Sequence, residues 1–216
     1  MAPRTYTLRK RADSAAETRA RVISAAASVY REGGVAAATV SAIAARADVS
    51  RGTVLHHFGD LDGLLTAVLE QAVADVRFPD RSMFDGATSD EERLRRYVDA
   101  IVRFNDRSGD WWQVFSRDIG RLPVLIEAES RFWAIVGDLQ AMALGPVSAD
   151  PRIGRAVGAL LFPNTLWSFR HAGFDLDGTI EVLGDLVVAL VSMRPAAVSA
   201  RGTAGTRRLP GQEGGS

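Results

Sequence analysis

The chain has 216 residues, of which 47% are hydrophobic and 24% charged, and its 26 Lys and Arg balance its 26 Asp and Glu. This composition is typical of a folded globular protein and excludes a disordered chain. The sequence contains no cysteine, which excludes disulfide bonds, thiolate zinc sites and cysteine nucleophiles.

The amino-terminal end is basic. Residues 1–60 carry nine Lys/Arg against five Asp/Glu (+4), whereas residues 61–196 carry fourteen against twenty (−6). Residues 1–13 are predicted to form a basic flexible arm, whose cationic residues are Arg4, Arg9, Lys10 and Arg11. Two readings of this arm stay open: it follows DNA phosphates or a minor groove, or it is simply a solvated end.

No segment resembles a signal or a membrane span. The start, MAPRTYTLRKRAD, lacks an apolar signal core. The longest strongly apolar stretch, Leu186 to Val191, is far shorter than the ~20 residues that a span needs. We therefore expect a cytoplasmic protein.

Four helices are predicted over residues 14–78. Ser14-x-x-Glu17 is a capping box for the first helix, which Gly33-Gly34 ends. Two short helices follow, at about 39–47 and 50–57, with N-caps at Thr39 and Ser50. Asp60 caps a fourth helix that Pro79 stops at about residue 78.

Helical spacing continues through residues 79–196, and residues 197–216 are predicted to be a disordered tail. Pro163 should kink the penultimate helix and free the carbonyl of Ala159. The last helix is apolar on nearly every side, so we expect it to be central or shared with another chain. The predicted helices, about nine in the whole chain, continue at 94–107, 111–119, 123–144, 150–173 and 177–193.

The segment TVSAIAARADVSRGTVLHHF, residues 39–58, has the pattern of a helix-turn-helix. Two short helices are joined by the three residues 47–49, a length that sets helices at a steep angle. The second helix is expected to expose donors suited to phosphates and base edges: Arg51, Thr53, His56 and His57. From this pattern alone, a pair of short core helices remains an equal alternative.

The stretches TRARVISAAASVYREGG and TVSAIAARADVSRGTVLHHFGDLDGLL resemble the amino-terminal domain of the TetR/AcrR family, in unbroken register from Thr18 to Leu65. The resemblance implies an all-α protein: a three-helix DNA-binding domain with a helix-turn-helix, followed by a larger helical domain for ligand binding and dimerisation. It also implies a homodimer, joined through the last two helices, on double-stranded operator DNA. Arg51 would contact guanine O6 and N7. The DNA-binding residues that it implies are Thr39, Ser41, Arg51, Gly52, Thr53, Leu55, His56 and His57. Arg46 is added to them as a cation that can compensate for missing phosphate contacts.

Three positions depart from the family pattern. Leu55 replaces a Tyr, and Leu61 replaces a Lys, both of which commonly contact phosphate. Their loss should lower the salt-dependent part of DNA binding. Asp48 replaces a frequent turn Gly, a milder change because Asp tolerates left-handed backbone.

The region after residue 69 is rich in aromatic residues that suit a pocket for an apolar, aromatic effector. An ordinary packed core is the more common arrangement for such residues. The pocket candidates, with their polar markers, are Arg103, Phe104, Arg107, Trp111, Trp112, Phe115, Phe132, Trp133, Phe162, Asn164, Trp167 and His171.

The sequence offers no sign of catalysis. It contains no phosphate-binding loop, dinucleotide-binding turn or nucleophile elbow. The adjacent His56 and His57 lack the i, i+4 spacing of a helical metal pair, so neither metal nor cofactor is expected. We therefore expect a ligand-responsive transcriptional repressor that binds a near-palindromic operator. The alternative is an all-helical small-molecule or protein-binding module that has lost operator binding, motivated by Leu55 and Leu61.

Overall fold

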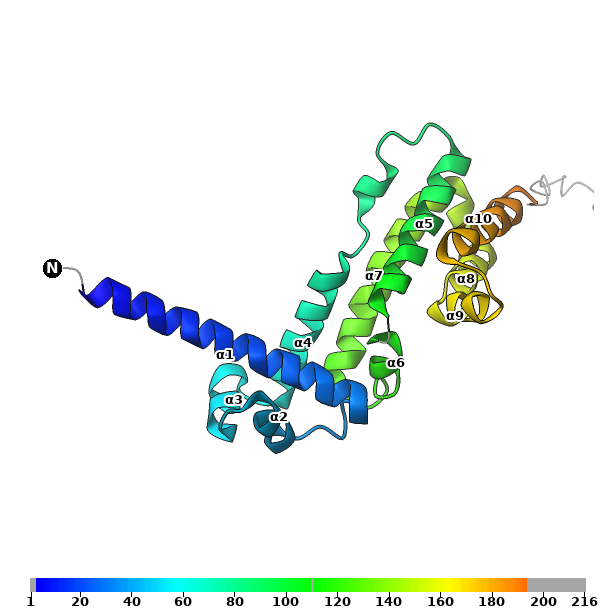
Figure 1. Ribbon diagram of the computed structural model, residues 1–216. Helices are drawn as coiled ribbons and strands as arrows, with labels where there is room; N and C mark the ends of the chain where they lie inside the picture. Colours follow the sequence, from blue (N-terminus) through cyan, green and yellow to red (C-terminus); the bar gives the residue numbers. More distant parts are fainter. Residues whose placement is uncertain (1–2, 110, 194–216) are drawn as a thin grey trace, which may run out of the picture.

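The computed structural model describes residues 3–109 and 111–193, with side chains from residue 12 onward. These residues form ten α-helices and two short 3-10 helices, without a strand among them, which confirms the all-α prediction (Figure 1). The predicted tail at 197–216 lies outside the described residues. The elements are α1 Pro3–Gly33, α2 Val40–Ala47, α3 Arg51–Phe58, α4 Leu61–Val76, η1 Arg81–Phe84, α5 Asp90–Ser108, α6 Trp111–Ser116, α7 Pro123–Leu144, η2 Gly145–Ala149, α8 Pro151–Leu160, α9 Pro163–His171 and α10 Leu176–Ser192.

Helices α1 to α4 form an amino-terminal head, in which α1 packs on α2 and α4 and α3 packs on both α2 and α4 (Figure 1). Three of the four predicted N-caps of the head are confirmed. The Thr39 hydroxyl accepts the Ala42 N–H at 3.2 Å, and the Asp60 carboxylate accepts the Gly63 N–H at 2.8 Å. Ser50 caps α3 by accepting the Thr53 N–H at 3.0 Å. Each cap satisfies a backbone donor that the first turn of a helix leaves unpaired.

The predicted start of the first helix at Ser14 is wrong, because α1 already begins at Pro3. Proline suits the first turn of a helix, where its missing N–H is not needed. The Thr18 hydroxyl donates to the Ser14 carbonyl at 2.9 Å, the i−4 bond of a residue well inside a helix. Helix-forming Leu, Arg and Lys before Ser14 therefore continue the helix towards the amino terminus instead of forming an arm without structure.

Helices α5 and α7 to α10 form a second body around another apolar core, whereas Val114 of α6 and Leu125 of α7 are buried in the core of the head. Helices α5 and α7 run side by side, and α10 packs across α5 next to α8 (Figure 1). Val98 and Val102 of α5 and Leu183 and Val187 of α10 are fully buried in that core. Helix boundaries differ from the prediction by a few residues: α4 ends at Val76, where Arg77 has φ 47°, and a short 3-10 turn lies within the predicted loop at 80–89.

The penultimate helix is divided in two at Pro163, which raises the predicted nine helices to ten. Helix α8 ends at Leu160 and α9 begins at Pro163. Proline cannot donate a backbone hydrogen bond, and its ring prevents a continuous helix. The carbonyl of Ala159 accepts a hydrogen bond from the Thr165 hydroxyl at 2.9 Å, so the freed acceptor finds the new partner that the sequence predicts.

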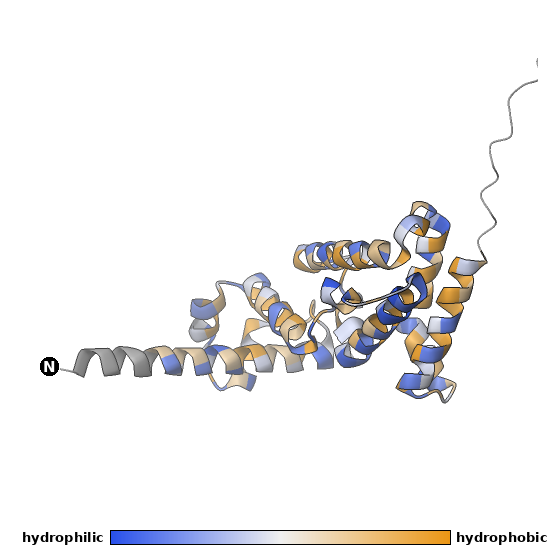
Figure 2. Ribbon diagram, turned by 90° about the horizontal axis from the view of Figure 1, so that it is seen from above, coloured by the Kyte–Doolittle hydropathy of each residue, from blue (hydrophilic) through white to orange (hydrophobic). Residues whose placement is uncertain are grey.

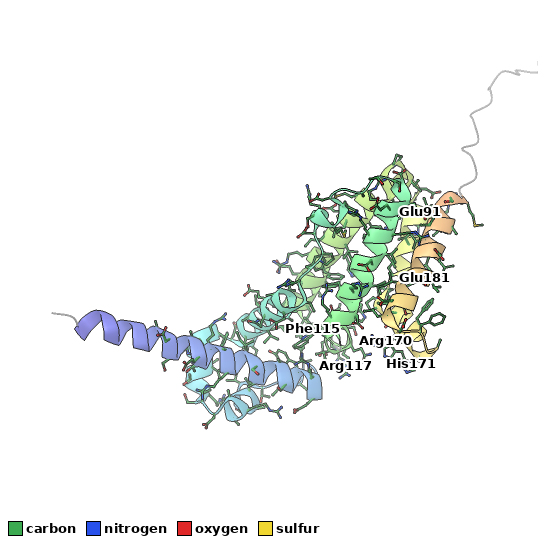
Figure 3. The ribbon with its side chains drawn as sticks, turned by 45° about the horizontal axis from the view of Figure 1, so that its top comes forward. Glu91, Phe115, Arg117, Arg170, His171 and Glu181 are labelled. Carbon is green, nitrogen blue, oxygen red and sulfur yellow. The ribbon has the colours of Figure 1, made fainter. Side chains whose placement is uncertain are left out.

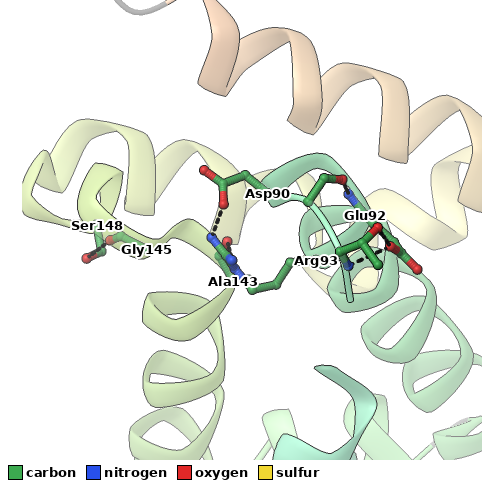
Figure 4. A network of polar contacts seen from close by, with 8 residues as sticks. Asp90, Glu92, Arg93, Ala143, Gly145 and Ser148 are labelled. Atoms are coloured by element: carbon green, nitrogen blue, oxygen red, sulfur yellow. Dashed lines mark hydrogen bonds and ion pairs between the residues drawn. The ribbon is translucent and has the colours of Figure 1, made fainter. Parts of the chain in front are cut away.

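A polar network fixes the start of α5 against the end of α7 (Figure 4). Arg93 donates to Asp90 at 2.8 Å and to the Ala143 carbonyl at 3.2 Å. Next to it, Glu92 accepts both the backbone N–H and the hydroxyl of Thr88 at 2.9 Å. The Thr88 bonds, together with an ion pair to Arg96, lower the pKa of the Glu92 carboxyl from 4.5 to about 2.

This lowered pKa makes the stability contribution of Glu92 depend on pH. A carboxyl with a lower pKa in the folded state stabilises the fold above its unfolded pKa and loses that contribution as pH falls towards the folded value. We expect Glu92→Gln to lower the melting temperature above about pH 5, with the difference from the parent shrinking between pH 4.5 and pH 2. Thermal melts across this range, followed by circular dichroism, measure it. A difference that stays constant with pH contradicts the prediction.

Candidate nucleic-acid interface and cavity

Helix α3 presents its outer face to solvent at the end of the head. Val54 is 1% exposed and anchors the helix to the head core, whereas Arg51, Gly52, Leu55 and His56 are exposed. A side chain buried on one face of an eight-residue helix leaves the opposite face to project outwards. The exposed side chains therefore project from the head into solvent.

Two residues predicted to face DNA are less free than the sequence indicates. Thr53 is half-buried, and its hydroxyl lies 2.9 Å from the hydroxyl of Ser50. His57 is also half-buried, with its ring beside those of His56 and Phe58. Both side chains contribute to the shape of α3 and its start.

Helix α2 supplies the other predicted contacts. Thr39 caps the helix at its start and Ser41 is exposed on its first turn. The Arg46 guanidinium forms a two-point ion pair with Glu32 of α1, with one N–O distance of 2.7 Å. Hydrogen bonding to Arg46 lowers the pKa of the Glu32 carboxyl, so the pair stays charged at neutral pH. A phosphate would have to share or displace Glu32 to reach Arg46.

The three departures from the family pattern occupy distinct places. Leu55 is 42% exposed on the outer face of α3, where it offers a methyl contact and no hydrogen bond. Leu61 is half-buried and packs against the head core. Asp48 ends α2 with φ 53° and ψ 53°, the left-handed conformation for which glycine is usual.

A cavity of about 440 Å³ lies between the head and the second body. Its walls come from α4, α5, α6, α7, α9 and the start of α10, and apolar area dominates its lining. Phe115 of α6 and Arg170 of α9, both labelled in Figure 3, lie on this lining. The aromatic residues that line the cavity are Phe104, Trp111, Trp112, Phe115, Phe132 and Trp167.

All six of these aromatic residues are among the predicted pocket residues, as is Asn164, which also lines the cavity. The other predicted candidates lie elsewhere. Arg103 binds Asp99 and Asp177 at 2.8 Å each, and Arg107 donates to the Val76 carbonyl at 3.0 Å. The remaining candidates are Trp133, Phe162 and His171. The rings of Trp133 and Phe162 are stacked on each other, and the His171 ring contacts Trp167, which lines the cavity.

Sequence reasoning missed most of the polar groups of the cavity. Asp106 of α5 lines it in an ion pair with Arg170 of α9. Glu129 lines it from α7 and accepts the Trp133 indole N–H at 3.3 Å. For Glu129 a signal was available, because it lies three residues from Phe132 and residues three or four apart share a helix face. Asp106 lies two residues from Phe104, a spacing that gives no such signal.

Among residues 3–109 and 111–193, no cluster of three or more acidic or histidine side chains is arranged to hold a metal ion. Within the same ranges, no helix has both the length and the apolar character needed to cross a membrane.

The head is similar to a known family. Residues 22–68 match the family described as bacterial regulatory proteins, tetR family. The HTH-type transcriptional regulator BetI of Paraburkholderia phytofirmans is 41% identical over 111 residues, which cover 49% of this chain and 57% of BetI. The chain spans about half the length of the curated relatives that it matches.

Two crystal structures extend the similarity to most of the chain. A protein from Pseudomonas aeruginosa PAO1 superposes with a TM-score of 0.64 at 20% identity, over 81% of this chain and 90% of the other. The multidrug binding protein EbrR, complexed with proflavin, superposes with a TM-score of 0.51 at 25% identity, over 80% of this chain and 99% of EbrR. The first likeness concerns the fold alone.

Proposed function

Because residues 22–68 match the tetR family of bacterial regulatory proteins, we propose that the chain is a member of this family: a repressor that binds a near-palindromic operator as a homodimer and releases it when a small aromatic compound fills the cavity. The observation that carries the proposal is the outer face of α3, where Arg51, Leu55 and His56 are exposed around the buried anchor Val54. A cytoplasmic location and the absence of catalysis are part of the same proposal.

The roles on DNA follow from the chemistry of each side chain. Arg51 presents a planar fork of donors, which fits the O6 and N7 acceptors of guanine. The start of α2, with Thr39 and Ser41, directs unpaired N–H groups and hydroxyls at a phosphate. Gly52 lets the backbone approach the DNA, and Thr53, Leu55 and His56 flank the base edges. Arg46 and His57 have the weaker case as DNA contacts, because Arg46 pairs with Glu32 and the His57 ring lies beside that of Phe58.

A fluorescence-anisotropy titration with DNA from upstream of the protein's own gene tests operator binding. Tight, salt-dependent binding of one DNA segment supports the proposal. The rival is a helical binding module without operator affinity, which Leu55 and Leu61 favour because neither side chain can bind a phosphate. The absence of binding at low salt favours that rival.

The proposed dimer uses the outer face of α10 together with α8. Leu186 is 44% exposed, Ala189 is exposed, and Val182 and Leu190 are half-buried, all on one face of α10. Apolar residues also run along this helix in Figure 2. Two copies of α8 and α10 would form a four-helix bundle that removes this face from water.

We expect Leu186→Arg to convert the dimer into a monomer. The substitution places two charges at the centre of an apolar contact, and desolvating them opposes association. Analytical ultracentrifugation at micromolar concentration measures the change. Ile135→Arg is the matched control, because Ile135 is 48% exposed on α7. Equal sedimentation of both variants would place the interface elsewhere.

The cavity is proposed to bind a planar aromatic compound, because its lining is mainly apolar and includes six aromatic residues. The four tryptophans of the chain are Trp111, Trp112, Trp133 and Trp167, and three of them line the cavity. Proflavin, which EbrR binds, is the first probe. We expect proflavin to quench the intrinsic tryptophan fluorescence of this protein with saturation, and unsaturable quenching would contradict an aromatic ligand site.

A further inference from the structure

A buried carboxylate joins the second body to the head. Asp118, two residues beyond α6, is 6% exposed. Its Oδ2 atom accepts the backbone N–H of Val35 at 2.8 Å and that of Ala36 at 3.0 Å, in the connection between α1 and α2. Hydrogen bonds to an ionised carboxylate are stronger than neutral ones, more so away from water. We call these two bonds the Asp118 clasp.

Local geometry on both sides serves the clasp. Gly34 has φ +85°, and a Cβ atom there would lie 3.2 Å from Asp118 Oδ2, so glycine permits the close approach. On the other side, the Asp118 carbonyl accepts the backbone N–H groups of Arg121 and Leu122 at 2.9 and 3.3 Å. The carboxylate therefore projects from a closed turn and is fixed in direction.

Helix α6, which precedes Asp118, also forms a wall of the cavity. Trp111, Trp112 and Phe115 of α6 line the cavity, and the rings of Trp111 and Phe115 are stacked with centroids 4.9 Å apart. The Arg31 guanidinium of α1 lies 3.9 Å from the centroid of the Trp111 ring. A compound that packs on these rings meets α6, which contacts α1 and is followed two residues later by Asp118.

We propose that Asp118 is the positioning residue through which occupancy of the cavity controls the placement of the DNA-binding head. With the cavity empty, α6 holds the Val35 and Ala36 amides in place. An occupant that favours a displaced α6 weakens the clasp, so the head can turn on α4, and its two copies in the dimer lose the spacing that the operator requires. This inference rests on the proposed function.

Two substitutions of Asp118 distinguish loss of the clasp from a general loss of folding. Asp118→Ala removes the acceptor, whereas Asp118→Asn can retain it, because both N–H groups bind a single oxygen. By amide hydrogen exchange read by mass spectrometry, we expect faster exchange at residues 34–38 in Asp118→Ala and near-parent exchange in Asp118→Asn. Asp138→Ala, which removes an exposed carboxylate from α7, is the control and should leave these amides unchanged.

Coupling to the cavity is tested in two arms. In the first, proflavin is added without DNA, and we expect faster exchange at residues 34–38 once tryptophan quenching saturates. In the second, Ala128→Phe places a ring in the cavity, since Ala128 lines it from α7. We expect Ala128→Phe to weaken DNA binding by a factor of about five to 150 when it is introduced into the parent protein or into Asp118→Asn. When it is introduced into Asp118→Ala, DNA binding should weaken little further.

The outcomes distinguish the inference from the function on which it rests. Saturating quenching without any change at residues 34–38 overturns the role of the clasp and leaves the ligand site standing. Multiplicative losses for Ala128→Phe and Asp118→Ala also overturn it, because independent sites add in free energy. If proflavin does not bind, the proposed ligand class fails, and exchange at residues 34–38 in folded Ala128→Phe decides for or against the clasp.

Discussion

Arg51→Ala is expected to weaken binding to the operator by a factor of about 5 to 150, which corresponds to about 1–3 kcal/mol. Arg51 is exposed on the first turn of α3, beside a Gly that permits close approach. Its loss removes a two-point contact with one base, so the variant should also tolerate substitution of a single base pair in each half-site. Fluorescence anisotropy with the parent operator and with single-base variants measures both effects.

The salt dependence of binding separates a base contact from a phosphate contact. Replacing a side chain that neutralises one phosphate reduces the salt slope by about one unit, whereas a base contact leaves it nearly unchanged. We expect a nearly unchanged slope for Arg51→Ala. Arg131→Ala is the matched control, since Arg131 is a 68% exposed arginine on α7, outside the head. Equal losses in the two variants would show that Arg51 acts only through net charge.

The helix-turn-helix could be predicted from sequence because its determinants are local. Thr39, Ser50 and Asp60 each cap a helix through a bond to a residue three positions later. Pro163 breaks its helix by its own covalent geometry, and the freed Ala159 carbonyl is met within the next few residues. Such signals need no knowledge of tertiary packing.

The sequence indicates which types of residue line the cavity, but not which side chains point into it. Phe104 and Arg103 are neighbours on α5, yet Phe104 lines the cavity and Arg103 pairs with Asp177 of α10. Successive helical residues point about 100° apart, so helix phase against the neighbouring helices decides which of them lines a cavity. That phase depends on packing between segments far apart in the sequence.

The Asp118 clasp lies beyond sequence reasoning for the same reason. Asp118 and Val35 are 83 residues apart, and neither the acceptor Asp118 nor the backbone donors of Val35 and Ala36 stand out in the local sequence pattern. A lone Asp after a short helix is most often a solvated turn residue. Only the fold shows that this carboxylate is buried against two backbone N–H groups.

The second large effect is expected for Leu64→Ala in α4. Leu64 is 0% exposed in the head core that also holds Val22, Ile43 and Val54 from the other three helices. Truncation removes apolar contacts and leaves a cavity that a close-packed core closes only in part, so we expect a loss of about 2–5 kcal/mol in the free energy of unfolding. Chemical denaturation followed by circular dichroism measures it, with dimer concentration held constant because association adds to apparent stability.

Val73→Ala is the matched control for this loss, because it truncates an apolar side chain on the same helix that is 51% exposed. We expect a change within about 0.5 kcal/mol there. Leu64 shares its core with Val54 of α3, which adds a functional consequence: its truncation should weaken operator binding before it unfolds the helices around the second core, which is a separate cluster. Similar losses of stability for the two variants would contradict the burial of Leu64 in the head core, and the support that this core gives to the exposed face of α3 would fail with it.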